Sequence, residues 1–269
     1  MPAASEQQGR LRGRLRLRWP RLLAVVSLAV VSLAVSNSPG DRRTAAVVRT
    51  VVALGDSVPS GGGCDCRAFP EMYAATSAAR VGEVARTVNL AVDGYTSAEV
   101  LSQVADPAAR SALQTADTVV IMVGANDFLQ ALADDLDGRC SQPDCYTLAK
   151  TSVTANVIDT IQQIHAIHPT PVSVIVVGYW NVAEDGSVGR AAYGADGMAK
   201  ADRATAYANT ALQQAAADTG AHYVATLAAF RGPGGGLDPT PLLAADGDHP
   251  NAAGHDRITQ ALFDADRDG

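Results

Sequence analysis

The chain has 269 residues, of which 47% are hydrophobic and 18% charged, with a formal net charge of -7. This composition is typical of a globular protein, excludes disorder over most of the chain, and fits one sizeable α/β domain. The acidic balance, without a basic stripe, disfavours nucleic acid and anionic membranes as partners, because both bind clustered Lys and Arg.

Residues 1–36 have the pattern of an export signal. Six arginines between Arg10 and Arg21 precede an apolar run, Leu22–Val35. The run is shorter than the ~20 residues of a membrane-spanning helix and ends in small residues that a signal peptidase reads. The arginines are not adjacent, which favours general secretion over the twin-arginine route. We predict cleavage after Ser36 and an extracellular protein of formal charge about -12, since 15 basic and 27 acidic residues remain; an uncleaved membrane anchor is the alternative.

A polar stretch over residues 37–48 is predicted to be a flexible linker, followed by the domain at 49–269. Short apolar runs within the domain predict strands. These runs are Val51–Leu54, Thr87–Val92, Val119–Val123, Val172–Val177 and His222–Leu227. Several are β-branched and nearly continuous rather than alternating, as expected for parallel strands that are covered on both faces.

Segments with helical period separate these runs. They predict helices over residues 147–167, ended by His168-Pro169, over 200–218, and in a last segment opened by Pro250. Alternating strands and helices imply right-handed crossovers and a three-layer α/β/α sandwich, with functional loops at the carboxyl ends of the strands.

The tripeptide Gly55-Asp56-Ser57 directly follows the first predicted strand. Ser57 is therefore expected at the carboxyl edge of the sheet, where loops gather around a crevice. A serine hydroxyl is a poor nucleophile unless a neighbouring base takes its proton. Taken alone, the tripeptide fits an ordinary strand-to-helix turn equally well.

The four cysteines fall in two short segments, as Cys64 with Cys66 and Cys140 with Cys145. An exported chain would carry them into an oxidising compartment, so we expect disulfides. Cys140 and Cys145 are the natural local pair, which leaves Cys64 with Cys66 across a tight ring; pairing between the segments stays open. A zinc site of four cysteines lacks the usual ligand spacing, so no metal is predicted.

Two positions after later strands could donate hydrogen bonds to an oxyanion. Gly94 offers an unobstructed backbone N–H after the second strand, and Asn126 a side-chain amide after the third. Such a donor is worth roughly 3 kcal/mol of transition-state stabilisation. Gly and Asn are also common in plain loop turns.

The candidate base is His249, just before the last predicted helix. Asp246, three residues earlier, can accept the proton of one ring nitrogen and leave the other free to face Ser57. Asp248 is the rival for this orienting role, but an adjacent residue usually points its side chain elsewhere. The other histidines are less suitable because they fall in helices or at a strand start: His165, His168, His222 and His255.

In chain order, Ser57, Gly94, Asn126 and His249 match the four residues that name the SGNH, or GDSL, hydrolase superfamily. The surrounding motifs match too: Gly55-Asp56-Ser57, Gly124-Ala125-Asn126-Asp127 and Asp246-Gly247-Asp248-His249. The domain therefore resembles this superfamily over essentially its whole length. The glycine-flanked serine elbow of the rival α/β-hydrolase fold is absent, because Pro59 stands where its second glycine would be.

The resemblance implies a flavodoxin-like sandwich with about five parallel strands, no metal or cofactor, and ester hydrolysis through an acyl-enzyme. It also implies an oxyanion hole made by the backbone amides of Ser57 and Gly94 and the side chain of Asn126. We expect a monomer that acts on a small-molecule, glycan or lipid ester. A secreted binding protein without turnover on the same scaffold is the alternative.

Specificity is expected to lie in the segments that the motifs do not fix, at 58–69, 128–147 and 179–199. Tyr179 and Trp180 either line a substrate pocket or pack beneath a neighbouring loop. The superfamily includes lipases, phospholipases, carbohydrate acetylesterases and thioesterases. No long amphipathic lid is visible in the sequence, which favours short-chain or carbohydrate esters over packed lipid.

Overall fold

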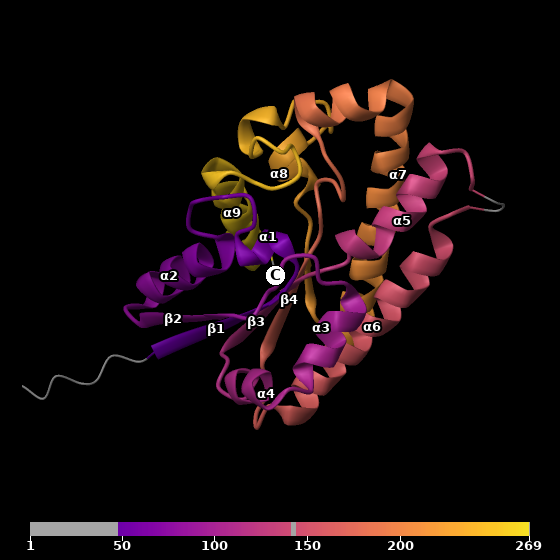
Figure 1. The fold of residues 1–269 in the computed structure, drawn as a ribbon. Helices are drawn as coiled ribbons and strands as arrows, with labels where there is room; N and C mark the ends of the chain where they lie inside the picture. The colour runs from indigo at the N-terminus through magenta and orange to yellow at the C-terminus, as the bar shows by residue number, and fades with distance from the viewer. Residues whose placement is uncertain (1–47, 141–143, 269) are drawn as a thin grey trace, which may run out of the picture. The chain divides into compact units, whose positions relative to one another are not determined.

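The computed structural model describes residues 48–140 and 144–268, and within them five strands form one parallel sheet (Figure 1). The strands are β1 (Val48–Gly55), β2 (Val84–Asn89), β3 (Thr118–Met122), β4 (Ser173–Val177) and β5 (His222–Val224). Their order in the sheet is β2-β1-β3-β4-β5, and every neighbouring pair is parallel. The predicted five-stranded parallel sheet is confirmed.

The predicted leader at 1–36 lies outside the described residues, as does the linker up to residue 47. The linker prediction is wrong at its last residue, because β1 begins at Val48 and its register pairs that residue with Val84. No helix in the described part of the chain is long and apolar enough to cross a bilayer.

Helices cover both faces of the sheet, which confirms the predicted three layers (Figure 1). On one face α2 (Phe69–Val81) packs against α9 (Ala252–Asp268), β1 and β2. On the other, α6 (Thr147–Ile167) packs between α3 (Ser97–Val104) and α7 (Gly186–Thr219), with α4 (Pro107–Leu113) and α5 (Ala125–Leu136) beside them. Short helices α1 (Ser57–Ser60) and α8 (Leu227–Arg231) and the 3-10 turn Thr240–Leu242 fill connections.

The central strands form the core. Val51–Leu54 of β1 and Val119–Met122 of β3 are fully buried, as the continuous apolar runs predict for strands with a helix layer on each side. Burying one such Val, Leu or Ile side chain stabilises a fold by about 1.5–3 kcal/mol. The sheet is therefore a rigid support for the loops at its carboxyl ends.

Two strand predictions are displaced along the chain. β2 runs from Val84 to Asn89 rather than from Thr87 to Val92, because its first three residues are exposed at the sheet edge and carry no apolar pattern. β5 ends at Val224, and Leu227 begins α8 instead of ending the strand. The displaced apolar residues Leu90 and Val92 still bond to β1 carbonyls as the chain leaves the sheet.

Two segments expected to be specificity loops are largely helical. α5 extends to Leu136, so only the later part of 128–147 connects two helices. α7 begins at Gly186, and a kink at Gly194 (φ +62°) divides it in two. The first part of α7 was not predicted because its glycines interrupt the helical pattern of the sequence. At Gly189 a Cβ would lie 2.3 Å from the Glu184 carbonyl oxygen, so close packing requires glycine there.

Candidate active site

Ser57 is the first residue of α1, directly after β1 and Asp56. The Asp56 side chain caps the helix by accepting the Val58 N–H at 3.1 Å. Gly55 has φ +146°, and a Cβ there would lie 1.9 Å from the Met122 carbonyl oxygen, so the turn requires glycine. Ser57 is thereby held, half-buried, at the carboxyl edge of the sheet.

His249 lies in a loop that Asp246 organises. One Asp246 oxygen is 2.9 Å from His249 Nδ1, and the other accepts the backbone N–H groups of Asp248 at 2.9 Å and His249 at 3.0 Å. The Asp248 carboxylate lies on the other side of the ring, 3.9 Å from Nε2. Asp246 rather than Asp248 therefore holds Nδ1, and the Asp248 carboxylate lies beyond hydrogen-bond distance of Nε2.

The two carboxyl groups differ in their electrostatics. Burial raises the pKa of Asp246, but the hydrogen bonds from His249 and Asp248 outweigh it and hold that pKa below its usual range. Burial raises the pKa of Asp248, and His249 offsets this only in part. Asp246 is therefore the better permanent anion beside the ring.

The dipeptide Gly62-Gly63 lies against both Ser57 and His249. A Cβ at Gly62 would lie 3.0 Å from the Ser57 Cβ, and one at Gly63 2.7 Å from the His249 Cβ and 2.9 Å from Asp246 Oδ2. Consecutive α-carbons are only 3.8 Å apart. The hydroxyl-bearing residue and the imidazole-bearing residue therefore border the same short piece of chain, on one side of the domain.

The other two candidate residues are tied to each other. Gly94 (φ +82°) is exposed in a turn closed by the Tyr95 N–H to the Val92 carbonyl, 3.1 Å. Asn126, the second residue of α5, donates one amide hydrogen to the Tyr95 carbonyl at 2.9 Å, which leaves its second hydrogen for a ligand. Within the described chain, the N–H groups of Ser57 and Gly94 have no backbone acceptor.

Asp127 fixes this loop to α5. Its carboxylate accepts the Ser97 hydroxyl at 2.6 Å and the Ser97 N–H at 2.9 Å. Ser97 begins α3 and also receives the Asn156 amide at 2.9 Å. The Asp of the Gly124–Asp127 motif thus anchors the loop that carries Gly94, a role the sequence did not suggest.

Tyr179 is the other residue whose place the sequence left open. It is 1% exposed, and its hydroxyl donates to Asp56 Oδ2. Trp180 is also 1% exposed and stacks on Phe230, with ring centroids 4.0 Å apart. Both side chains pack inside the protein, so the packing alternative is confirmed and the pocket alternative is wrong.

Asp56 is fully buried. Burial raises its pKa to about 7, although the Tyr179 hydroxyl and the Val58 N–H each lower it. A carboxyl that can be neutral near pH 7 thus lies next to the candidate nucleophile. Its only bonded partners in the described residues are neutral groups, since a phenol and an amide hold its two oxygens.

Both disulfides of the structure are local. Cys64 pairs with Cys66, immediately after Gly62-Gly63, and Cys140 pairs with Cys145 between α5 and α6, with Cα atoms 5.2 and 5.3 Å apart. Every cysteine of the chain is used in these two bonds.

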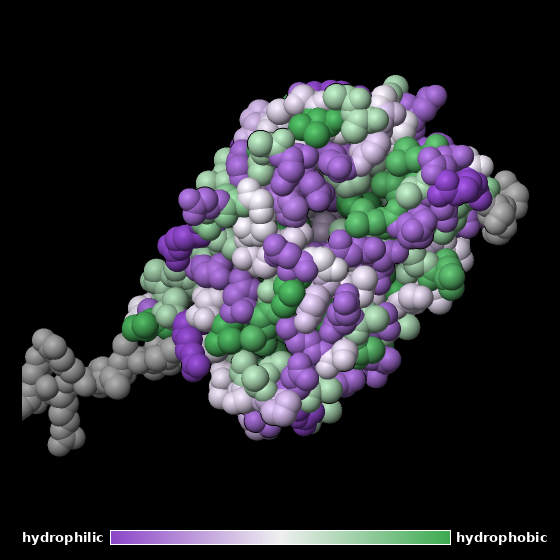
Figure 2. All heavy atoms as spheres, viewed as in Figure 1, coloured by the Kyte–Doolittle hydropathy of each residue, from purple (hydrophilic) through white to green (hydrophobic). Residues whose placement is uncertain are grey.

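A hollow of about 540 Å³ lies between α5 and α6 and reaches Asp127, the neighbour of Asn126. Its walls combine carboxylates with apolar groups: Asp127, Gln130, Ala131, Asp134, Arg139, Asp144, Cys145, Leu148, Ala149 and Ser152. Figure 2 shows small hydrophobic patches separated by hydrophilic groups on the face that carries α1. Of the residues in the site motifs, Asp127 lines this hollow.

The sequence and the fold together define the class of protein. The chain matches the profile of the GDSL-like lipase/acylhydrolase family over residues 53–257. It belongs to this family and is a carboxylic ester hydrolase. No curated protein matches the sequence.

This chain aligns with nearly the full length of several solved structures that have the same fold. The lipase Lip_vut3 from a goat rumen metagenome is 20% identical, with a TM-score of 0.67 over 81% of this chain and 97% of that one. An extracellular lipase from Streptomyces rimosus is 23% identical, with a TM-score of 0.59 over 81% and 99%. Phospholipase A1 from Streptomyces albidoflavus NA297 is 26% identical, with a TM-score of 0.58 over 82% and 100%.

Proposed function

We propose that the enzyme hydrolyses esters through an acyl-enzyme on Ser57, with His249 as general base and Asp246 as the group that orients the ring. One observation carries the proposal: Asp246 binds Nδ1 of His249 at 2.9 Å, while the backbone beside His249 is the same dipeptide that borders Ser57. A ring held at Nδ1 presents Nε2 as the proton acceptor, as triad catalysis requires.

The reaction then has two balanced halves. The Ser57 oxygen attacks the ester carbonyl while His249 Nε2 takes the hydroxyl proton, and the same proton leaves with the alcohol as the tetrahedral intermediate collapses. Water then attacks the acyl-enzyme while its proton passes to Nε2. When this second tetrahedral intermediate collapses, the bond between the acyl carbon and the Ser57 oxygen breaks, the acid departs, and the Ser57 oxygen takes the proton back from Nε2. The N–H groups of Ser57 and Gly94 and the second amide hydrogen of Asn126 would hold the oxyanion.

For the substrate we propose soluble esters with a short acyl chain or a carbohydrate alcohol. Carboxylates surround the site, with Asp248 and Asp246 beside the ring and Asp127 in the adjoining hollow. Carboxylates repel anionic lipid headgroups and accept hydrogen bonds from sugar hydroxyls. The mixed surface of Figure 2 fits a dissolved substrate better than a packed lipid layer.

We propose that the enzyme is secreted. Residues 1–36 carry the pattern of a signal peptide, and all four cysteines form disulfides, which persist in oxidising compartments. A structural neighbour of the same fold is an extracellular lipase.

The decisive experiment is labelling with a fluorophosphonate, which modifies activated serines, followed by peptide mapping. Label is expected on Ser57, and Ser57→Ala should abolish both labelling and hydrolysis while the protein stays folded. Ser111→Ala is the matched control, since Ser111 is exposed on α4 before β3, at the opposite edge of the sheet. Label at another serine, or turnover by Ser57→Ala, would rule out the assigned nucleophile, and no label at all would favour a binding protein.

Asn126→Ala tests the oxyanion donors. It should lower kcat by about 10²–10³-fold with little change in KM, because the donor acts on charge that develops in the transition state. Steady-state kinetics on a model ester would measure this split. An effect on KM alone would contradict the assignment.

A further inference from the structure

The backbone of Tyr179 is held at the carboxyl end of β4 by one side chain of α7. Asn209 accepts the Tyr179 N–H and donates to the Tyr179 carbonyl, both at 2.8 Å. The preceding Gly178 makes room for this arrangement, because a Cβ there would lie 2.8 Å from the Asn209 oxygen. The backbone from which the Tyr179 side chain projects is therefore held in place.

The Tyr179 hydroxyl joins the two loops that carry the proposed nucleophile and oxyanion donor. It donates to Asp56 Oδ2, and a backbone hydrogen bond from Ala125 partly offsets the burial that raises the pKa of this hydroxyl. Asp56 Oδ1 in turn accepts the Val58 N–H. β3 lies between β1 and β4 in the sheet, so the tyrosine passes over the end of β3 to make this connection.

The linked residues are direct chain neighbours of the reacting groups. Asp56 precedes Ser57, and Ala125 precedes Asn126. Each loop turns on a glycine with positive φ, +146° at Gly55 and +129° at Gly124. The Asp56 N–H also donates to the Met122 carbonyl at 3.1 Å, so the tyrosine adds a side-chain connection to loops that the sheet already brings together.

We propose that Tyr179 is a positioning residue of the esterase site, whose hydroxyl fixes Ser57 and Asn126 at the separation that the reacting carbonyl needs. The proposal rests on the proposed function of these two residues. A misplacement of about 1 Å in a site of this kind can cost roughly 100-fold in rate.

The test is Tyr179→Phe, which removes the hydroxyl and keeps the ring. It should lower kcat by about 10–100-fold and slow fluorophosphonate labelling of Ser57, with KM changed by less than about two-fold, because substrate contacts remain. Hydrolysis kinetics and labelling rates measure both effects.

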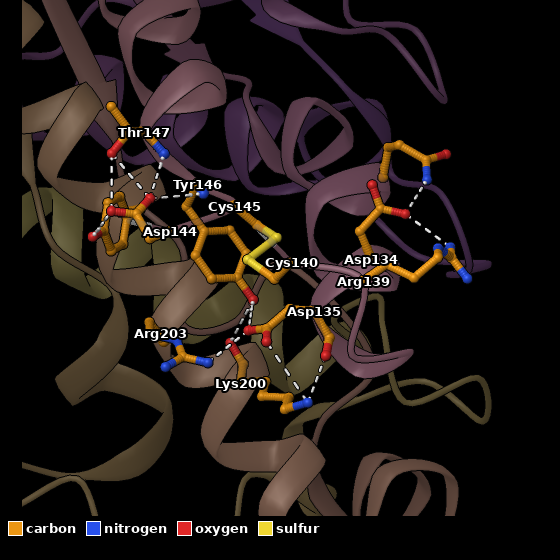
Figure 3. Close-up of a disulfide and its surroundings, with 12 residues drawn as sticks. Asp134, Asp135, Arg139, Cys140, Asp144, Cys145, Tyr146, Thr147, Lys200 and Arg203 are labelled. Atoms are coloured by element: carbon orange, nitrogen blue, oxygen red, sulfur yellow. Dashed lines mark hydrogen bonds and ion pairs between the residues drawn. A yellow bond between two sulfur atoms is a disulfide. The ribbon is translucent and has the colours of Figure 1, made fainter. Parts of the chain in front are cut away.

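A matched control exists in the same molecule. Tyr146 is also 1% exposed, and its hydroxyl donates to the buried carboxylate of Asp135 at 2.7 Å, beside the Cys140–Cys145 disulfide (Figure 3). Tyr146→Phe removes an equivalent bond away from the proposed catalytic loops. It should lower thermal stability and leave kcat within about two-fold.

A double-mutant cycle tests whether Tyr179 acts through Asp56. Asp56→Asn keeps an oxygen to cap Val58 but leaves the tyrosine hydrogen without its carboxylate. If the two residues act through one connection, the double variant should have about the kcat of the slower single variant; independent effects would multiply.

Two results would overturn the proposal: an unchanged kcat in folded Tyr179→Phe, or equal kcat losses in Tyr179→Phe and Tyr146→Phe. Should Tyr179→Phe not fold, Asp56→Asn decides alone, since wild-type kcat in that variant would remove the residue through which Tyr179 acts. The proposed function fails separately, through turnover by Ser57→Ala.

Discussion

Two buried tyrosine–aspartate pairs in this enzyme have the same hydrogen bond and different surroundings. Tyr179 donates to Asp56 beside the proposed nucleophile, and Tyr146 donates to Asp135 between the helices α5 and α7. Around Asp135 stand Arg203, 2.6 Å from Oδ2, and the Lys200 ammonium, 3.7 Å from Oδ1 (Figure 3). Among the described residues Asp56 has no lysine or arginine partner.

The difference reverses the direction of the pKa shift. Burial raises the pKa of Asp56 to about 7. Burial acts on Asp135 in the same sense, but Tyr146, Arg203 and Lys200 outweigh it and lower its pKa. A tyrosine alone therefore does not keep a buried carboxylate charged; a cation does. The pair without a cation lies beside the proposed nucleophile, and the pair with cations lies beside the Cys140–Cys145 disulfide.

The largest predicted effect is on the pH dependence of stability. Folding raises the pKa of Asp56 from 3.8 to about 7. The protonated carboxyl therefore contributes fully to the free energy of unfolding below pH 3.8, and about 4 kcal/mol of this contribution is lost as the pH rises towards 7. Asp56→Asn should therefore gain about 4 kcal/mol relative to wild type between pH 4 and pH 8. Denaturant unfolding at both pH values measures it.

Asp135→Asn is the contrasting variant. The lowered pKa of Asp135 places its titration below pH 3.8, where its contribution is lost as pH falls. The loss of stability caused by Asp135→Asn should therefore be nearly constant between pH 4 and pH 8. A similar pH trend in the two variants would break the comparison.

A second prediction extends the comparison to a buried histidine that has no acidic partner among the residues described. His255 is 0% exposed, and its Nδ1 accepts the Phe69 N–H at 3.2 Å. Burial lowers its pKa to about 4, so stability is complete above pH 6.5 and falls by about 3 kcal/mol as pH drops to 4. His255→Asn, whose amide oxygen can accept the same N–H, should remove this acid-side loss.

Unfolding of His255→Asn and wild type at pH 4.5 and pH 7.5 checks this expectation. His165→Asn is the matched control, because the His165 side chain is exposed at the end of α6. An unchanged acid-side loss in His255→Asn would mean that burial does not keep this ring neutral.

The smallest predicted effect concerns the cation itself. Arg203→Met should lower stability at pH 7 by about 1 kcal/mol, a value reduced by the 52% exposure of the arginine side chain and by the remaining Lys200. Thermal unfolding measures it, with Arg110→Met on the exposed surface of α4 as control. No loss at pH 7 would show that Tyr146 and Lys200 suffice to hold Asp135 ionised without Arg203.

Much of the fold follows from local pattern. α6 spans residues 147–167 as predicted, because its apolar period is regular and His168-Pro169 ends it. The central strands were recognisable because burial on both faces makes them continuously apolar. The motifs at Ser57 and His249 were recognisable because each lies just after a strand or just before a helix.

What the sequence missed depends on long-range contact. The link from Tyr179 to Asp56 joins residues 123 positions apart, and only the sheet order makes them neighbours across β3. A tyrosine following a glycine at the end of a buried strand was the available signal. Helices α2, α3 and α4 had no predicted counterpart. The helices α3 and α4 are short, with 8 and 7 residues, and the burial of all three is set by partners elsewhere in the chain.

Gly63 limits how the entrance of this enzyme can be redesigned. The residue is exposed, yet any side chain would press on the His249 ring, and its φ of +70° already disfavours other residues. Gly94 also has a positive φ, but a Cβ there would contact no other atom. An asparagine at this position would therefore lower stability by only about 1–2 kcal/mol. Libraries meant to change which esters enter should therefore leave position 63 constant.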